Sequence, residues 1–192
     1  MQGMRFANGF NVGIHGGSNF PQNQINDFYE PGLNLGGHVG WQPMMSPLGL
    51  RLNVSWNRLN GRDLANQTIG GVRYEADLAN ADLVSGFADA KLRLPHFGRA
   101  NMLSGLYAIG GGGITYFRNY SQFGATTGTP AGQNVVRTFD AQDVTRFALN
   151  GGAGLSFGIG PVALFVEGRY VRVFTAGQDT DFVPVTLGLS FH

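Results

Sequence analysis

The chain has 192 residues, of which 31 are glycine, and its 13 basic and 12 acidic side chains give a net charge of +1. Charged residues make up 13% of the sequence, about half the share in an ordinary soluble domain, while 43% are hydrophobic. This composition excludes a disordered tail, and the near-zero net charge gives no support to a nucleic-acid partner. The absence of cysteine excludes disulfides and thiolate metal sites.

Apolar residues recur at every second position in eight segments, which predicts β-strands with one apolar face. In chain order the predicted strands lie at 10–14, 33–41, 48–56, 84–94, 103–117, 147–157, 162–170 and 183–191. No run approaches 18 apolar residues, so we expect no transmembrane helix, and no segment predicts a helix of another kind. Segment 103–117 is ambiguous as to its faces, and we place on its outward face Leu106, Ala108, Ile114 and Tyr116.

The connections between the predicted strands alternate in length. Long ones lie at about 18–32, 58–82 and 118–144, with a moderate one at 172–181, and short turns lie at about 43–47, 95–101 and 160–161. This alternation is typical of an up-and-down meander whose two ends differ, as in outer-membrane barrels. We therefore expect one domain over 1–192. Internal turn signals at 70–71 and 129–132 predict that the flanking segments continue as hairpins beyond the membrane.

Alternation also fits a soluble barrel whose apolar face points inward. The space inside the barrel decides between a soluble barrel and a membrane barrel. Eight strands leave an interior just wide enough for side chains, and the apolar faces here are too bulky for that space. The opposite faces are small and polar, for example Asn53, Ser55, Gly152 and Gly154. The apolar face then meets lipid, and the sequence predicts an all-β fold, an eight-stranded antiparallel up-and-down transmembrane β-barrel.

The aromatic residues at the strand ends are typical of the two girdles that membrane interfaces favour. Three lie next to short turns or the end of the chain, namely Trp41, Phe157 and Phe191. Four lie next to long connections, namely Trp56, Tyr116, Phe147 and Tyr170.

Segments 164–170 (LFVEGRY) and 182–191 (FVPVTLGLSF) resemble the OmpA/OmpX-type eight-stranded outer-membrane barrels and their opacity-protein relatives. The strand pattern of the whole chain is similar to theirs. The resemblance implies a place in the bacterial outer membrane with both chain ends in the periplasm. It also implies that the last strand, through Leu187, Leu189 and Phe191, is the signal that the barrel-assembly machinery reads. His192 departs from the family pattern, in which the aromatic residue is last.

Seven charged residues fall on inward faces, and we expect them to pair across the lumen, since burying them separately would cost several kcal/mol each. They are Arg51, Asp89, Lys91, Arg93, Arg146, Glu167 and Arg169. Two acids against five bases leave a positive excess, which implies water or anions inside. The favoured interpretation is a polar plug that holds the barrel closed, and a narrow anion-preferring channel is the alternative.

Metal, cofactor and catalytic patterns receive little support. His15 and His38 point inward on neighbouring strands but have no carboxylate close in sequence, so we expect no metal and no cofactor. Lipid A-modifying barrels use a Ser–His pair near the rim, but Ser18 lies three residues after His15 and so on the opposite face of the strand. We expect no catalytic residues.

The sequence therefore predicts a non-enzymatic integral outer-membrane protein with a structural or surface-interaction role, including adhesion, through its long connections. Apolar residues there, such as Tyr74, Tyr120 and Phe123, favour contact with a partner or with copies of the protein. The expected partners are the lipid bilayer with lipopolysaccharide and, during biogenesis, the barrel-assembly machinery. Two alternatives stay open: a lipid A-modifying enzyme and a small narrow channel.

Overall fold

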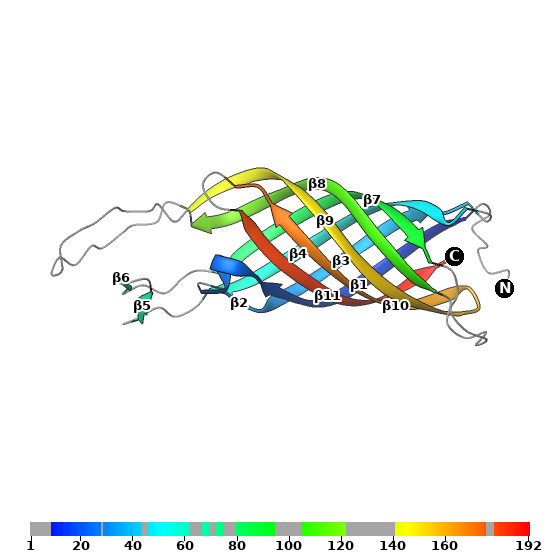
Figure 1. Ribbon diagram of the computed structural model, residues 1–192, viewed down its shortest axis with the longest axis horizontal. Helices are drawn as coiled ribbons and strands as arrows, with labels where there is room; N and C mark the ends of the chain where they lie inside the picture. The colour runs from blue at the N-terminus through cyan, green and yellow to red at the C-terminus, as the bar shows by residue number, and fades with distance from the viewer. Residues whose placement is uncertain are drawn as a thin grey trace.

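The computed structural model describes residues 9–27, 29–43, 46–61, 67–69, 72–74, 80–94, 105–121, 141–175 and 179–192. Within these residues eight antiparallel strands close into a barrel (Figure 1). The barrel strands are β1 (Phe10–Pro21), β3 (Gly32–Trp41), β4 (Leu48–Gly61), β7 (Ala81–Arg93), β8 (Leu106–Ser121), β9 (Ala141–Ile159), β10 (Val162–Val173) and β11 (Thr180–Phe191). Each pairs with the next along the chain, and β1 pairs with β11 to close the ring. The predicted fold class is confirmed.

The two ends of the barrel differ. β1 begins and β11 ends at the same end, where Val12 lies opposite Phe191, and the short connections lie there too (Figure 1). We call it the turn end. The longer connections leave from the opposite end, the loop end. The minor elements belong to these longer connections: β2 (Tyr29–Glu30), which pairs with the last residues of β4, and the hairpin of β5 (Gln67–Ile69) and β6 (Val72–Tyr74).

One short helix corrects the expectation of none. A 3-10 turn, η1 (Asn23–Asp27), follows β1 at the loop end. It opens on Asn23, whose φ of 56° is a left-handed conformation that asparagine tolerates better than most residues. The Asn23 amide donates a hydrogen bond of 2.6 Å to Asp181 on β11, which ties the turn to the barrel. Among the described residues no helix is long and apolar enough to cross a membrane.

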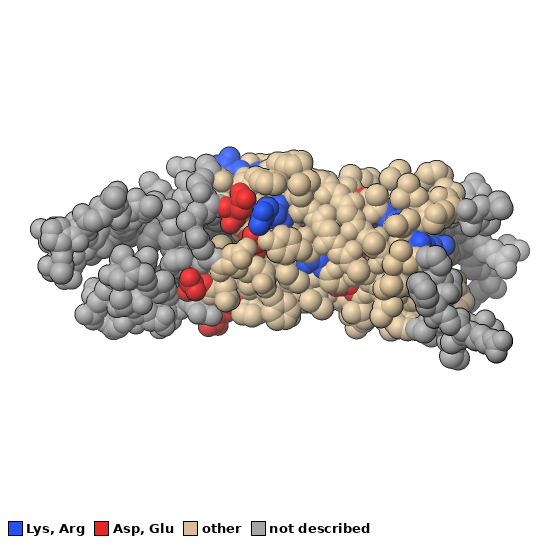
Figure 2. Space-filling model, viewed as in Figure 1, with Lys and Arg blue, Asp and Glu red and all other residues tan. Residues whose placement is uncertain are grey.

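The exterior of the barrel is apolar and the lumen is polar. On β4 the outward Leu50, Leu52 and Val54 are 59%, 65% and 61% exposed, whereas the alternating Arg51 and Asn53 are 4% and 3% exposed. The face shown in Figure 2 carries mostly uncharged residues over the middle of the barrel. Water does not stabilise a continuous leucine and valine surface around a barrel whose charges are buried inside, so the exterior faces lipid.

The ambiguous strand has the predicted orientation. Leu106, Ile114 and Tyr116 are exposed on the outside of β8, and Ala108 lies half-buried on the same face. The inward residues that alternate with them include Tyr107, which is 1% exposed.

Most strands extend further at the loop end than predicted. β1 runs to Pro21 rather than stopping before 18, β8 runs to Ser121 and β9 begins at Ala141, so the expected bounds 18–32 and 118–144 are wrong. The bounds 58–82 and 172–181 also shift, by two to four residues, because β4 ends at Gly61, β7 begins at Ala81, β10 ends at Val173 and β11 begins at Thr180. Backbone pairing does not require apolar side chains, so it continues where the apolar alternation stops.

The short turns agree with the prediction where they are described. Gly160 and Pro161 join β9 to β10, and Gly160 has the positive φ of 65° that this tight turn requires. β3 ends at Trp41 and β4 begins at Leu48, which brackets the predicted turn at 43–47. The predicted turn at 95–101 lies outside the described residues.

Charge placed on the lipid face of β4 tests the orientation of the strands. Leu52→Arg puts a guanidinium near the middle of the apolar run, and we expect it to lower the free energy of unfolding by about 2–4 kcal/mol. The control is Asn53→Ala, one position along and facing the lumen, where the side-chain amide nitrogen donates no hydrogen bond to the protein that could be lost. Urea unfolding in lipid vesicles measures both variants. Equal losses would contradict the assignment of faces.

Candidate functional site in the barrel lumen

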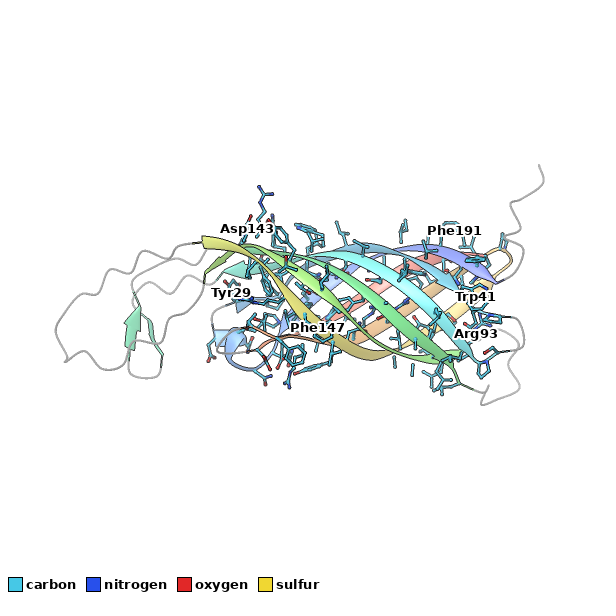
Figure 3. All side chains as sticks on the ribbon, turned by 90° about the horizontal axis from the view of Figure 1, so that it is seen from above. Tyr29, Trp41, Arg93, Asp143, Phe147 and Phe191 are labelled. Carbon is cyan, nitrogen blue, oxygen red and sulfur yellow. The ribbon has the colours of Figure 1, made fainter. Side chains whose placement is uncertain are left out.

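The loop end of the lumen is closed by an apolar cluster. Its members come from six barrel strands and from β2, and they pack as one group: Tyr29, Leu59, Ala81, Leu83, Phe87, Phe117, Ala148, Val171, Val173 and Phe182. Tyr29 lies at this end in Figure 3. These side chains lie at inward positions of the alternating strands, and most of them lie in the part of their strand nearest the loop end. In the described residues the mouth of the barrel at the loop end is therefore filled by side chains.

An uncharged polar layer follows. The amides of Asn19, on β1, and Asn34, on β3, donate hydrogen bonds to the side-chain oxygen of Asn57 on β4, the first at 3.1 Å. The hydroxyls of Ser85 and Thr115 share a hydrogen bond of 2.9 Å between β7 and β8. Asparagine and serine are short enough to fit a lumen of eight strands and polar enough to bond across it.

A buried ionic network forms the next layer. Arg51 on β4 donates two hydrogen bonds of 2.9 Å to Glu167 on β10, and its Nε lies 3.7 Å from Asp89 on β7. Arg169 on β10 bridges the same two acids, with its NH1 3.1 Å from Asp89 and its Nε against Glu167. All four are at most 8% exposed. Two cations and two anions in mutual contact satisfy the requirement that buried charges be paired.

Two neutral residues that were not among those predicted from the sequence complete the network. The hydroxyl of Tyr107 donates to Glu167 at 2.8 Å, and the amide of Asn150 donates to Asp89 at 2.8 Å. Both occupy inward positions of strands that were correctly predicted. Their positions could have suggested this role, because an inward tyrosine on β8 and an inward asparagine on β9 fall within reach of charges in the lumen.

Three of the seven predicted residues do not join an ion pair. Lys91 and Arg93 lie two and four positions nearer the turn end than Asp89 on β7, and Arg93 is exposed. Arg146 lies on β9 opposite Thr115, four positions from Asn150 toward the loop end, and its Nε is buried without a hydrogen-bond partner. Among the described residues no carboxylate lies within 4.0 Å of these three. These three cations are the positive excess expected from two acids against five bases, and their positions along the strands keep them away from Asp89 and Glu167.

Inward rings lie over glycines that face them on the neighbouring strand. In the register of the sheet Tyr107 is opposite Gly154, Phe165 is opposite Gly188, His38 is opposite Gly13, and His15 is opposite Gly36. A Cβ atom at any of these glycines would overlap the ring. Glycine therefore makes room for each ring in the narrow lumen.

The two histidines lie near each other but not in a metal-binding group. Their ring centroids are 6.4 Å apart, and His38 packs edge-on against Phe165. No set of three or more histidine, aspartate or glutamate side chains suited to a metal occurs in the described parts of the chain. Ser18 is exposed on the outside of β1, whereas His15 faces the lumen, so this serine and histidine do not form a dyad.

The predicted interface aromatics all lie on outward positions. Trp41 and Phe191 lie at the turn end (Figure 3), and Phe157, two residues after the outward Leu155 on β9, shares its outward face. Toward the loop end lie Trp56, Tyr116, Phe147 and Tyr170. Leu187, Leu189 and Phe191 of the predicted assembly signal are exposed on the lipid face of β11.

Arginine–aspartate pairs lie directly beyond two of these aromatics at the loop end. Arg172 packs over Tyr170 at 5.9 Å and donates two hydrogen bonds of 2.9 Å to Asp181. These bonds hold the pKa of the Asp181 carboxyl below its usual range. Arg58 repeats the arrangement over Trp56, with Asp82 as its partner at 2.9 Å.

A closed barrel with an apolar exterior, aromatic girdles and a filled polar lumen defines an integral membrane protein of the outer-membrane type. No protein-family model matches the chain, and no curated protein does at a significant level. Solved structures do. The chain is similar to Neisserial surface protein A at 15% identity and a TM-score of 0.55, covering 95% of this chain and 96% of that one. It is similar to a major outer membrane protein from Thermus thermophilus at 15% identity and a TM-score of 0.57, covering 95% and 98%.

The fold is that of the OmpA/OmpX-type eight-stranded outer-membrane barrels, as predicted from the sequence. The location that this fold and the lipid-facing exterior define is the bacterial outer membrane, where barrels of this architecture reside.

Removing one charge from the network tests its contribution to stability. Glu167→Gln leaves Arg51 and Arg169 without their shared carboxylate, and we expect a loss of about 3–5 kcal/mol in the free energy of unfolding. The control is Asp179→Asn, a half-exposed acid 4.0 Å from Arg172, which should cost about 1 kcal/mol or less. Unfolding in vesicles compares them. If the two variants lost the same amount, Glu167 would not hold buried cations.

A second prediction concerns the glycine beneath Tyr107. Gly154→Val forces the ring to move, and overpacking of this kind should cost about 1–3 kcal/mol. The matched control is Gly151→Val on the same strand, where an added Cβ meets nothing within 4 Å on the lipid face. That variant should be as stable as the parent. Thermal unfolding and the near-ultraviolet circular dichroism of tyrosine report the two effects, and an unperturbed Gly154→Val barrel would contradict the packing.

Proposed function

We propose that this protein is a non-enzymatic outer-membrane barrel with a structural and surface-interaction role, and that it binds its partners through the chain beyond the loop end. The observation that carries the proposal is the filled lumen. The apolar cluster at the loop end and the network around Glu167 fill two levels of the described interior, with the uncharged polar layer between them. A barrel filled at these levels has no open path through its middle, so its contacts with other molecules fall to its outer surface and its ends.

The loop end has short strands whose backbone could pair with another chain. The ladder between β8 and β9 resumes after an irregularity, with Tyr120 opposite Gln142 and Ser121 opposite Ala141. β5 and β6 form a small antiparallel pair, and within the part of the chain that the structure describes β2 pairs with β4 alone. Short strands with unpaired edges can add a strand from another chain. This supports partner binding or self-association at the loop end.

Lipopolysaccharide is a second proposed partner. Arg58 and Arg172 lie on the outside of the barrel immediately beyond Trp56 and Tyr170, at the level where lipid headgroups meet water. Arginine favours phosphate through paired hydrogen bonds. We also propose that Leu187, Leu189 and Phe191 act as the assembly signal, since all three are accessible along the outer face of the last strand.

An anion channel and a lipid A-modifying enzyme are the two alternative functions. A narrow anion channel would need a continuous path past the apolar cluster, and conductance by single barrels in a planar bilayer would reveal one. A lipid A-modifying enzyme would need a serine and its base together on the outward rim. Ser18 is on the outward face, but the histidine closest to it in sequence is in the lumen. A change in lipid A acylation on expression would favour the enzyme.

Replacement of the loop-end connections tests the proposal. Residues 62–80 and 122–140 are exchanged together for short Gly-Ser turns. We expect a folded barrel whose migration on a gel still shifts on heating, because the strands and the lumen are intact. Surface adhesion of cells displaying it, and self-association of the purified barrel in detergent, should be lost.

The control exchanges residues 176–178, in the moderate connection, for a Gly-Ser segment of equal length and should keep both interactions. If the doubly shortened barrel retained every interaction of the parent, the loop-end proposal would be wrong and a purely structural role would stand.

A further inference from the structure

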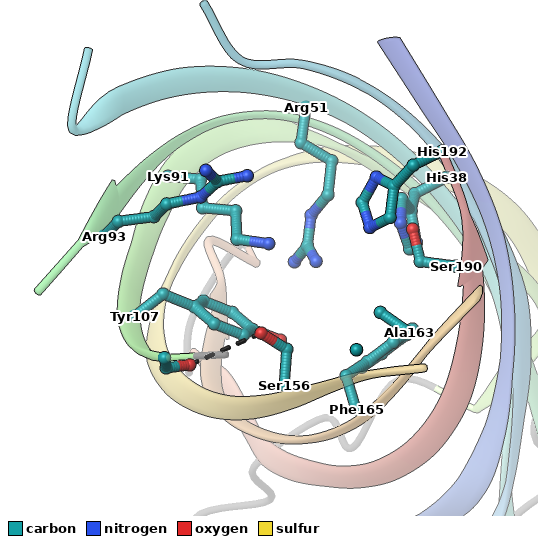
Figure 4. A pocket seen from close by; sticks show the side chains of 12 residues that line it. His38, Arg51, Lys91, Arg93, Tyr107, Ser156, Ala163, Phe165, Ser190 and His192 are labelled. Atoms are coloured by element: carbon teal, nitrogen blue, oxygen red, sulfur yellow. Dashed lines mark hydrogen bonds between the residues drawn. The ribbon is translucent and has the colours of Figure 1, made fainter. Parts of the chain in front are cut away.

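A cavity of about 200 Å³ occupies the turn end of the lumen, on the far side of the ionic network from the apolar cluster. Its lining includes His38, Arg51, Lys91, Arg93, Tyr107 and Ser190 (Figure 4). The cationic side chains lie on one wall, and Ala163 and Phe165 lie on the opposite wall. Since a water molecule in the liquid takes about 30 Å³, the space is large enough for several waters or one small solute.

The charge around this cavity is not balanced. Glu167 and Asp89 are already engaged by Arg51 and Arg169, two acids for two guanidinium groups. Lys91 and Arg93 add two positive charges, and among the described residues no carboxylate lies within 4.0 Å of either. Lys91 Nζ is 4.0 Å from the centroid of the Tyr107 ring, a contact that orients the ammonium without neutralising it.

Buried hydrogen-bonding capacity is also unused there. Arg51 is 4% exposed, and its Nε has no hydrogen-bond partner despite lying 3.7 Å from Asp89. His38 is buried as well, and its Nδ1 has no partner. Buried polar groups in native proteins are nearly always satisfied by protein, water or a ligand.

No aspartate or glutamate side chain is available from elsewhere near this cavity. Ten of the twelve aspartates and glutamates lie in the loop-end connections or the strand segments next to them, and the other two are Asp89 and Glu167. Segments 1–9, 42–47, 94–105 and 160–161, which adjoin the strands in sequence on the turn-end side, contain neither aspartate nor glutamate. The side chains of the given sequence therefore offer no further acid to balance Lys91 and Arg93.

We propose that this cavity is a binding site for a phosphate group presented from the periplasmic side of the membrane. Lys91 and Arg93 contact the oxyanion, Arg51 forms the floor of the site, and the wall of Ala163 and Phe165 contacts any apolar part attached to the phosphate. The phosphate can come from the free ion or from a phosphomonoester such as a headgroup carried on a chain. This site is independent of the loop-end role proposed above.

Calorimetric titration of the refolded barrel in dodecyl maltoside, a detergent without phosphate, tests the site. The probes are inorganic phosphate and hexyl phosphate, with hexylammonium as the probe of opposite charge. We expect both phosphates to bind, more weakly as salt rises, and hexylammonium not to bind. Equal affinity for the two phosphates identifies the free ion as the ligand. Tighter binding of hexyl phosphate identifies a phosphomonoester that uses the apolar wall.

The test variant is Lys91→Gln with Arg93→Gln, which removes both unpaired cations and leaves the ionic network in place. It should weaken phosphate binding about tenfold or more, since two charge-assisted contacts are lost. The matched control is Arg146→Gln, which removes one unpaired cation from the lumen on the loop-end side of the ionic network, away from the cavity, and should bind as the parent does. Heat-shifted migration on a gel verifies that each variant is folded. Absence of phosphate binding, or equal binding by the double variant, would overturn the proposal.

Discussion

Lipid offers no hydrogen-bond partner to a peptide group, so a strand that enters the hydrocarbon core must be paired along both edges. The described strands meet this requirement as a closed ring, in which β1 pairs with β11. Closure at eight strands leaves a lumen only as wide as the side chains that fill it. Each inward residue must therefore fit the one across from it, which explains why Gly154 lies beneath Tyr107 and why the buried arginines meet carboxylates.

The strands and their faces could be predicted because lipid outside and a narrow polar lumen inside impose alternation residue by residue. Leu106, Ile114 and Tyr116 are exposed as expected even in the glycine-rich strand where the pattern was weakest. The strand ends at the loop end could not be predicted, because beyond the lipid the ladder continues without an apolar face. Pro21 and Ser121 are still paired although nothing in their hydropathy indicates it.

The sequence could predict that opposite charges pair inside the lumen, but it could not predict which residues are partners. An inward charge implies an inward counter-charge, and Arg51 and Glu167 do meet. Which charges meet depends on the stagger of the strands, because the stagger sets how far along the barrel axis each residue lies, its height. Arg146 and Arg93 share the inward face with the others but lie at other heights, and Tyr107 and Asn150 enter the network because they lie at its height. Alternation fixes the face of a residue and leaves its height open.

The ionic network also ties distant parts of the sequence together. Arg51 and its bidentate partner Glu167 are 116 residues apart, and Asp89 and the guanidinium of Arg169 are 80 apart. A chain that ended at β9 would lack both of these partners and would leave Arg51 and Asp89 only each other, at 3.7 Å. β10 supplies both partners, and β11, the next strand, closes the ring against β1. The mutual neutralisation of the four side chains therefore depends on a strand near the end of the sequence, and a barrel truncated before β10 would hold buried charges without their main partners.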